Sequence, residues 1–261
     1  MIKISLKTLI LPALFIFLSA ASFAKPNGID KIKKAGTLSV GVKDDVPGLS
    51  YLNPETKEFE GLEIDIARAI AKSILGSESK TTFIPVSAKN RSAFLNQEKV
   101  DLVIATFTIT EERKQNYDFS DVYYTDSVGI MVKKSSGITS LKNLENKKIG
   151  VTQGSMTSAT IKNAAIKNGV FLNVVTYPSN QTLKDALKHG EIDAFAIDNS
   201  ILHGYIDENV MILPERFDEM MYAVAIKKDN SAVTKQVNEV IRNLIKSGEL
   251  EKLMAKHGLK F

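Results

Sequence analysis

Cysteine and tryptophan are both absent from the 261-residue chain, and histidine occurs only three times. The lack of cysteine excludes disulfides, thiolate catalysis, cysteine-ligated zinc and lipid attachment through an N-terminal cysteine. The histidines are scattered without zinc-binding spacing, so we expect surface roles for His189, His203 and His257. Hydrophobic residues make up 44% and charged residues 25% of the chain, which excludes disordered, collagen-like and coiled-coil classes. The length allows one large domain or two lobes of roughly 100 residues.

The first 24 residues are typical of a secretory signal peptide. Lys3 and Lys7 precede an apolar run from Leu9 to Leu18, and Ser22-Phe23-Ala24 supplies the small residues of a cleavage site. A membrane anchor needs about 20 apolar residues, so the short run predicts cleavage rather than anchoring. We therefore expect cleavage after Ala24 and export to the periplasm, as a monomer that does not insert into the membrane.

The charges of the remaining chain are nearly balanced. Two of the 34 basic residues leave with the signal peptide, so 32 basic side chains stand against 30 acidic ones. Proteins that bind nucleic acid concentrate basic residues on one face, and no such concentration is present in the sequence. We expect no nucleic-acid partner.

Short β-branched runs alternate with helical patterns, which is the signature of an α/β fold. Apolar stripes at helical spacing run from Leu62 to Leu75 and from Val233 to Ile245, and both predict helices that face a core. The predicted strands are Leu38–Val42, Thr82–Val86, Asp101–Thr106, Ile130–Lys133, Lys148–Val151, Asn173–Tyr177, Ile192–Ile197, Val210–Leu213 and Tyr222–Lys227.

Two stretches of the chain have the same order of predicted elements. Residues 94–106 and 186–198 each read as a helix end, a turn and a buried strand, in the same register. This weak duplication indicates two lobes of similar construction, although chance similarity between βα units is an alternative. The two strands end in Thr106 and Asp198, and open α/β sheets bind ligands beyond the carboxyl ends of their strands. The two side chains therefore either converge on one cleft or simply cap their strands.

Two further features predict the binding of an anion. Arg113 follows Thr110, a predicted helix N-cap, and a cation in a first helical turn favours a nearby anion. Its planar guanidinium suits a carboxylate, although a local pair with Glu111 is the alternative. Residues 153–157 precede another helix, where free N–H groups form an anion-binding corner unless Ser155 or Thr157 merely caps the helix.

Three ordered segments carry a resemblance to a known family. They are Phe59–Ala67, Val100–Arg113 with the following Phe119–Tyr124, and Gly150–Ser155. With these segments the chain resembles the type II periplasmic solute-binding proteins of the polar amino acid family, which are receptors of ABC importers. Val42–Pro47 and Ala88–Arg91 are similar to the aspartate- and glutamate-binding subset.

The resemblance implies two similar α/β lobes, a two-strand hinge and a ligand in the cleft between the lobes. The chain would cross between lobes near residues 125–130 and 215–221. The first lobe would then comprise residues 25–127 and 219–261, and the second residues 128–218. The resemblance also implies ligand-binding roles for Lys43, Arg91, Thr106, Thr108, Arg113, Ser155, Thr157, Asp198 and Tyr222.

Those roles divide the ligand between the lobes. Arg113 would bind the α-carboxylate, assisted by Thr108 and the corner at Ser155 and Thr157. Asp198 would accept the α-ammonium, and Tyr222 would lie near the second hinge crossing. The ligand side chain would be surrounded by Lys43, Arg91 and Thr106. The alternatives are a surface ion pair of Lys43 with Asp44 or Asp45, and an Arg91 that only lies on the surface of its helix.

Pocket charge then predicts an acidic ligand. Lys43, Arg91 and Arg113 contribute +3 and Asp198 contributes −1, and the excess of +2 favours aspartate or glutamate over a zwitterion. Glutamine or another polar amino acid is the alternative. Asn180 stands where the acidic subset tends to have tyrosine, a departure that bears on side-chain recognition.

The resemblance implies that ligand drives hinge closure, that an inner-membrane ABC permease recognises the closed form, and that no cofactor is needed. An enzyme on this fold, such as a dehydratase, would need a carboxylic acid with a raised pKa. We expect Asp198 to stay ionised beside the three cations, which favours a receptor. A chemoreceptor or surface-interaction module is a further alternative.

Overall fold

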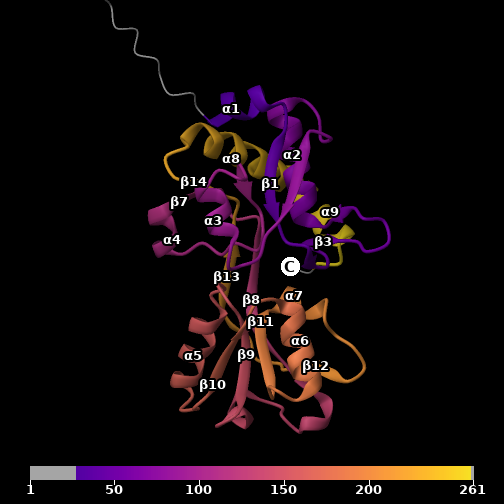
Figure 1. Cartoon of the computed structure of the whole chain (residues 1–261), viewed down its shortest axis with the longest axis vertical. Coiled ribbons are helices and arrows are strands. Elements are labelled where there is room, and N and C mark those ends of the chain that lie inside the picture. Colours follow the sequence, from indigo (N-terminus) through magenta and orange to yellow (C-terminus); the bar gives the residue numbers. More distant parts are fainter. Residues whose placement is uncertain (1–27, 260–261) are drawn as a thin grey trace, which may run out of the picture.

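The structure is a computed structural model that describes residues 28–259, and the predicted signal peptide with its cleavage site lies outside them. Two α/β lobes are stacked along the long axis of the molecule (Figure 1). We call the lobe with the five-stranded sheet the first lobe and the lobe with the six-stranded sheet the second lobe. The predicted α/β class and two-lobed architecture are confirmed.

The first lobe is built on a sheet of order β5-β1-β6-β14-β7, in which β1 is parallel to both neighbours. The strands are β1 (Leu38–Val42), β5 (Thr81–Pro85), β6 (Leu102–Val103), β7 (Tyr117–Phe119) and β14 (Ala225–Lys227). A small sheet beside it contains β2 (Asp45–Val46), β3 (Ser50–Leu52) and β4 (Phe59–Glu60). The helices are α1 (Gly28–Ala35), α2 (Leu62–Leu75), α3 (Arg91–Asn96), α4 (Glu111–Asn116), α8 (Ser231–Lys246) and α9 (Glu249–Lys256).

The second lobe has a sheet of order β10-β9-β11-β8-β12, with β13 paired to β8. The strands are β8 (Tyr124–Lys133), β9 (Lys148–Thr152), β10 (Asn173–Tyr177), β11 (Ala194–Asp198), β12 (Val210–Ile212) and β13 (Phe217–Tyr222). The helices are α5 (Thr157–Lys167), α6 (Asn180–His189) and α7 (Asn199–His203), with 3₁₀ turns η1 (Lys134–Ser136) and η2 (Leu141–Leu144).

Strands β8 and β13 form the connection between the lobes (Figure 1). From Val128 onward β8 pairs with β11 and β12 inside the second sheet. Its first residues, 124–127, pair only with β13, in an antiparallel register that joins Tyr124 to Tyr222. The stretches predicted to cross between lobes lie in β8 and at β13, and we keep the lobe limits at 127/128 and 218/219 as a proposal.

Helices α2 and α8 form where the apolar stripes predict them. Ile66, Ile70 and Ile74 face the core from α2, and Gly76 ends that helix in the left-handed conformation. The apolar face of α8 packs against α2. The C-terminal helices therefore return to the first lobe.

The sequence prediction differs from the structure where the chain leaves a sheet. The predicted strand at 101–106 is shortened to Leu102–Val103, and beyond its end Thr106 adopts a left-handed φ of 48°. The predicted strand Tyr222–Lys227 is divided between β13 and β14 by two residues that belong to neither strand. Strands β2 to β4 and β7 were not predicted, since runs of only two or three residues are too short to show an alternating apolar pattern.

Candidate functional site

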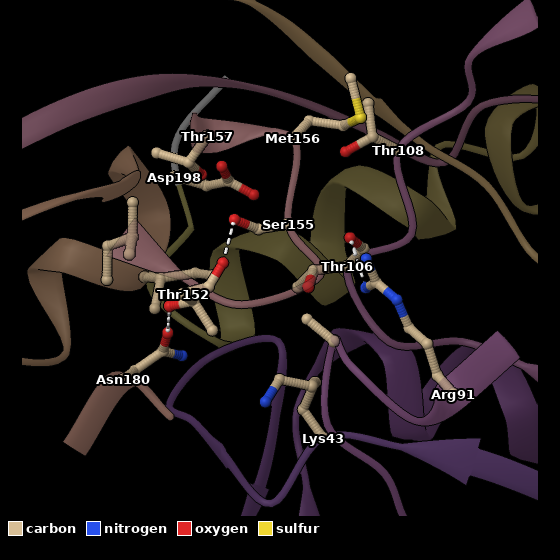
Figure 2. Close-up of a pocket in the computed structure, with 13 residues that line it drawn as sticks. Lys43, Arg91, Thr106, Thr108, Thr152, Ser155, Met156, Thr157, Asn180 and Asp198 are labelled. Carbon is tan, nitrogen blue, oxygen red and sulfur yellow. Dashed lines mark hydrogen bonds between the residues drawn. The ribbon is translucent and has the colours of Figure 1, made fainter. Parts of the chain in front are cut away.

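A cavity of about 30 Å³ lies between the two lobes, at the carboxyl ends of β1, β9 and β11. The first lobe contributes Lys43, Ala88, Arg91, Thr106 and Thr108, and the second contributes Thr152, Ser155, Met156, Thr157, Asn180, Ile197, Asp198 and Ile201. In Figure 2, Lys43 and Arg91 extend from the first lobe, and Thr152, Ser155 and Asp198 face them from the second.

Seven of the nine predicted residues line this cavity: Lys43, Arg91, Thr106, Thr108, Ser155, Thr157 and Asp198. Arg113 and Tyr222 do not line it, but each contacts a residue that does. Arg113 donates to the Thr108 carbonyl at 2.7 Å, and the Tyr222 hydroxyl donates to the Asp198 carboxylate. The structure therefore brings the whole predicted set to one place.

Arg91 supports the loop that carries Thr106. It begins α3, is almost fully buried, and donates to the carbonyls of Ala105 and Thr106, the latter at 3.0 Å. The amide of Thr106 in turn donates to the buried carboxylate of Glu63 at 2.6 Å. These bonds hold Thr106 in its strained conformation at the edge of the cavity.

Two guanidinium groups contact one aromatic ring. The Cζ atoms of Arg91 and Arg113 lie 4.3 and 4.6 Å from the centre of the Phe107 ring. Burial, followed by the charge of Arg113, lowers the pKa of Arg91 to about 10, so Arg91 is still a cation near neutral pH. Its Nε atom has no hydrogen-bond partner among residues 28–259, which leaves one donor beside the cavity.

Arg113 reaches across to the second lobe. Thr110 caps α4 as predicted, by accepting from the Arg113 amide at 3.1 Å. The alternative pairing with Glu111 does not form, because that carboxylate pairs with Lys114 at 2.7 Å. The Arg113 guanidinium instead lies 3.5 Å from the carbonyl of Gly154.

The corner before α5 differs from a simple helix cap. The N-cap position is held by Met156, and no described side chain accepts a bond from the first amides of α5. The Ser155 hydroxyl donates instead to the Thr152 carbonyl at 2.7 Å, and the Thr152 hydroxyl donates to Asn180 at 2.7 Å (Figure 2). The start of α5 therefore remains available to an anion.

Asp198 ends β11 and is buried at the cavity wall. Burial, and after it the charge of Asp126, raise the pKa of Asp198 to about 7. The Tyr222 hydrogen bond and the charges of Arg91 and Arg113 offset only part of this rise. The expectation that cations keep Asp198 firmly ionised was wrong, because it left out the cost of burial and the second carboxylate.

Lys43 forms an ion pair that changes the pocket charge. Its Nζ lies 2.6 Å from Asp45 Oδ1; the lysine side chain is only 7% exposed and that of Asp45 is 21% exposed, so the pair is partly buried. Glu63 lies close enough to Arg91 to stabilise its charge. With Asp45, Glu63 and Asp126 included, four carboxyl groups accompany the three cations, so the predicted excess of +2 left out three carboxyl groups near the cavity.

The lobes touch on both sides of the cavity. A Cβ at Gly154 would lie 2.7 Å from the carbonyl oxygen of Ala88, so glycine permits this approach. On another side, the Tyr205 hydroxyl of the second lobe donates to the Asp45 carbonyl at 2.9 Å. These contacts describe a closed cleft.

The comparisons identify a family. The model of the bacterial extracellular solute-binding proteins, family 3, matches residues 38–260. The ABC transporter glutamine-binding protein GlnH of Bacillus subtilis (strain 168) is 37% identical, over 91% of this chain and 86% of its own length. A glutamine-binding protein of Geobacillus stearothermophilus is 38% identical, over 84% and 83%. A solved structure of an ancestral arginine-binding protein bound to glutamine is 34% identical, with a TM-score of 0.75, and covers 85% of this chain and 97% of its own.

Proposed function

The chain belongs to family 3 of the bacterial extracellular solute-binding proteins, and from this we propose that it captures a neutral polar amino acid of the glutamine type in the cleft between its lobes. It is an amino acid receptor of an ABC transporter and not an enzyme. The raised pKa of Asp198 is the property that the enzyme alternative required. Within a family of solute-binding proteins, we assign this carboxylate to ligand binding.

The head group of an amino acid matches the charges at the two sides of the cavity. We assign the α-carboxylate to Arg113, with Thr108 and the corner from Ser155 to Thr157 that precedes and begins α5. The α-ammonium is assigned to Asp198, whose burial strengthens a charge-assisted hydrogen bond. Lys43, Arg91 and Thr106 surround the remaining space, with Asn180 opposite them.

The observation that carries the choice of ligand is the Lys43–Asp45 ion pair. Because the Lys43 charge already has a partner, a side-chain carboxylate would add an unbalanced negative charge near Asp45 and Asp198. A neutral amide adds none, and its oxygen and NH₂ group suit the donors and acceptors of the polar wall. Two glutamine-binding relatives at 37% and 38% identity support the same choice over aspartate or glutamate.

We further propose that the ligand stabilises a closed arrangement of the two lobes, with β8 and β13 as the hinge. A ligand in the cavity would contact both lobes at once. The closed monomer then docks on the membrane permease of the transporter in the periplasm. Every helix formed by residues 28–259 is too short or too polar to span a lipid bilayer. The same residues contain no cluster of histidine, cysteine and acidic side chains that would hold a metal ion.

The head-group assignment predicts a large loss of affinity in two variants. Arg113→Ala and Asp198→Ala should each weaken binding of every amino acid ligand by about 2–5 kcal/mol, since each leaves one ligand charge unpaired. Calorimetry on protein that has been unfolded, dialysed and refolded measures this loss. Mass spectrometry of the compound released on unfolding identifies the ligand that the protein carries.

Arg242→Ala and Asp207→Ala are the matched controls, because both side chains form ion pairs on the surface away from the cavity. They should bind as the wild type does. An Arg113 or Asp198 variant within threefold of wild type would remove that residue from the site.

A further inference from the structure

Asp126 is an acidic residue of the hinge that the proposed function does not use. It lies in the part of β8 that pairs only with β13. Its Oδ2 accepts from the amide of Ser200 at 3.0 Å and from the Ser200 hydroxyl, and its Oδ1 accepts from the amide of Ser127 at 2.7 Å. The carboxylate is therefore fixed in one orientation.

Tyr222 connects Asp126 to the cavity. The phenol of Tyr222 donates to Asp198 and lies 3.4 Å from Asp126 Oδ2, so one hydroxyl stands between two carboxylates. Tyr222 is fully buried, and burial raises its pKa well above the usual value, so the phenol stays protonated and keeps donating. Residues from β8, β13 and β11 thus meet behind the cavity wall.

We propose that Asp126 is a positioning residue of the ligand-ammonium site: it holds Tyr222 and Ser200 around Asp198, and its negative charge makes ligand affinity fall on mild acidification. This inference rests on the proposed function, in which Asp198 receives the ammonium group. A second carboxylate stabilises a bound ammonium and opposes the ionisation of Asp198 before ligand arrives.

The charged and titratable groups around Asp198 are few. Arg91 and Arg113 face it from the first lobe, Tyr222 from β13 and Asp126 from β8. Tyr124 lies beside Asp126, and burial raises its pKa to about 12, so it does not titrate near neutrality. Asp198 itself, with its pKa of about 7, is the group that changes charge between pH 6 and 8.

The sign of the pH dependence follows from this pKa. The amino acid ammonium is protonated throughout this range and binds the ionised form of Asp198. Affinity is therefore full above pH 7 and falls as Asp198 takes up a proton below it. Removal of the Asp126 charge removes one cause of the raised pKa of Asp198. The midpoint of the plot of affinity against pH therefore moves to lower pH.

The test is calorimetry with glutamine from pH 5.5 to 8.5 on the wild type and on Asp126→Asn, with Ser200→Ala as the control that keeps the charge. Below its midpoint the wild type should lose up to about tenfold in affinity per pH unit. Asp126→Asn should bind more weakly at pH 8.5, but its midpoint should lie about one unit lower. Ser200→Ala should keep the wild-type midpoint.

Two results would overturn the inference. One is a plot of affinity against pH for Asp126→Asn that lies below that of the wild type but has the same midpoint, which would mean a merely structural role. The other is a plot identical to that of the wild type. Asp126→Ser also removes the charge, and it replaces Asp126→Asn in the titration if the asparagine variant folds poorly. Asp198→Asn distinguishes a failure of the proposed function from a failure of the present inference. If this variant binds glutamine normally, the proposed ammonium site at Asp198 is wrong. If it loses binding while Asp126→Asn keeps the wild-type midpoint, only the present inference fails.

Discussion

At the scale of single residues, Thr152 and Asn180 form a polar wall of the cavity, which we assign to the ligand side chain. Their side chains are buried and joined by a hydrogen bond of 2.7 Å, in which the Asn180 oxygen is the acceptor. This bond leaves the Asn180 NH₂ group to donate toward the cavity. Thr152→Val should weaken glutamine binding by about 0.5–1.5 kcal/mol, because it frees the Asn180 amide to turn.

A double-mutant cycle with Asn180→Ala measures this coupling by calorimetry. Once the amide is absent, Thr152→Val should cost much less than in the wild type. Additive losses would show that the two residues act on the ligand independently.

Individual site residues were predictable where sequence segments and strand ends marked them. Thr106 ends one predicted strand and Asp198 follows another, and both line one cavity, as the first of the two alternatives expected. The effects of Glu63 and Asp126 were not predictable. Glu63 meets Thr106, and Asp126 meets Ser200, across more than 40 and 70 residues of chain, and local patterns carry no information on such distant pairs.

At the scale of elements, the turn between β9 and α5 limits how closely the lobes approach. Gly154 has a φ of 82° and lies against the backbone of Ala88, whereas Gly169 has a φ of 65° with nothing within 4 Å of a Cβ. Gly154→Ala and Gly169→Ala should each cost about 1–2 kcal/mol of folding free energy through the left-handed conformation. Only Gly154→Ala should also weaken the ligand, because its methyl group opposes closure.

Denaturant unfolding of stripped protein and ligand titration separate these two effects. Equal affinities for the two variants, at equal stability, would contradict the assignment of the Gly154–Ala88 contact to the closed state.

Elements with a clear local pattern of apolar and β-branched residues were predicted best. Strands β1 and β10 have the predicted limits, since each is a run of five residues rich in valine. The small sheet β2 to β4 was missed because its strands have two or three residues and depend on pairing with each other. Tertiary contacts, rather than local propensity, determine such elements.

At the scale of the whole molecule, the two lobes bring oppositely charged groups to one cavity and leave little net charge for the ligand to balance. The sequence showed the cations of this site but not the carboxyl groups that accompany them, and so it predicted an acidic ligand. The ion pair of Lys43 with Asp45 is the contact on which our proposal of a neutral ligand rests.

The most direct test is the ratio of the glutamate and glutamine dissociation constants, measured by calorimetry at pH 8, where Asp198 is mostly ionised. The wild type should bind glutamine at least about tenfold more tightly, a difference of about 1.4 kcal/mol. Asp45→Asn leaves the charge of Lys43 without its partner. The variant should therefore bind glutamate more tightly relative to glutamine than the wild type does. Wild-type protein that binds glutamate or aspartate as tightly as glutamine, with a ratio unchanged in Asp45→Asn, would contradict the account.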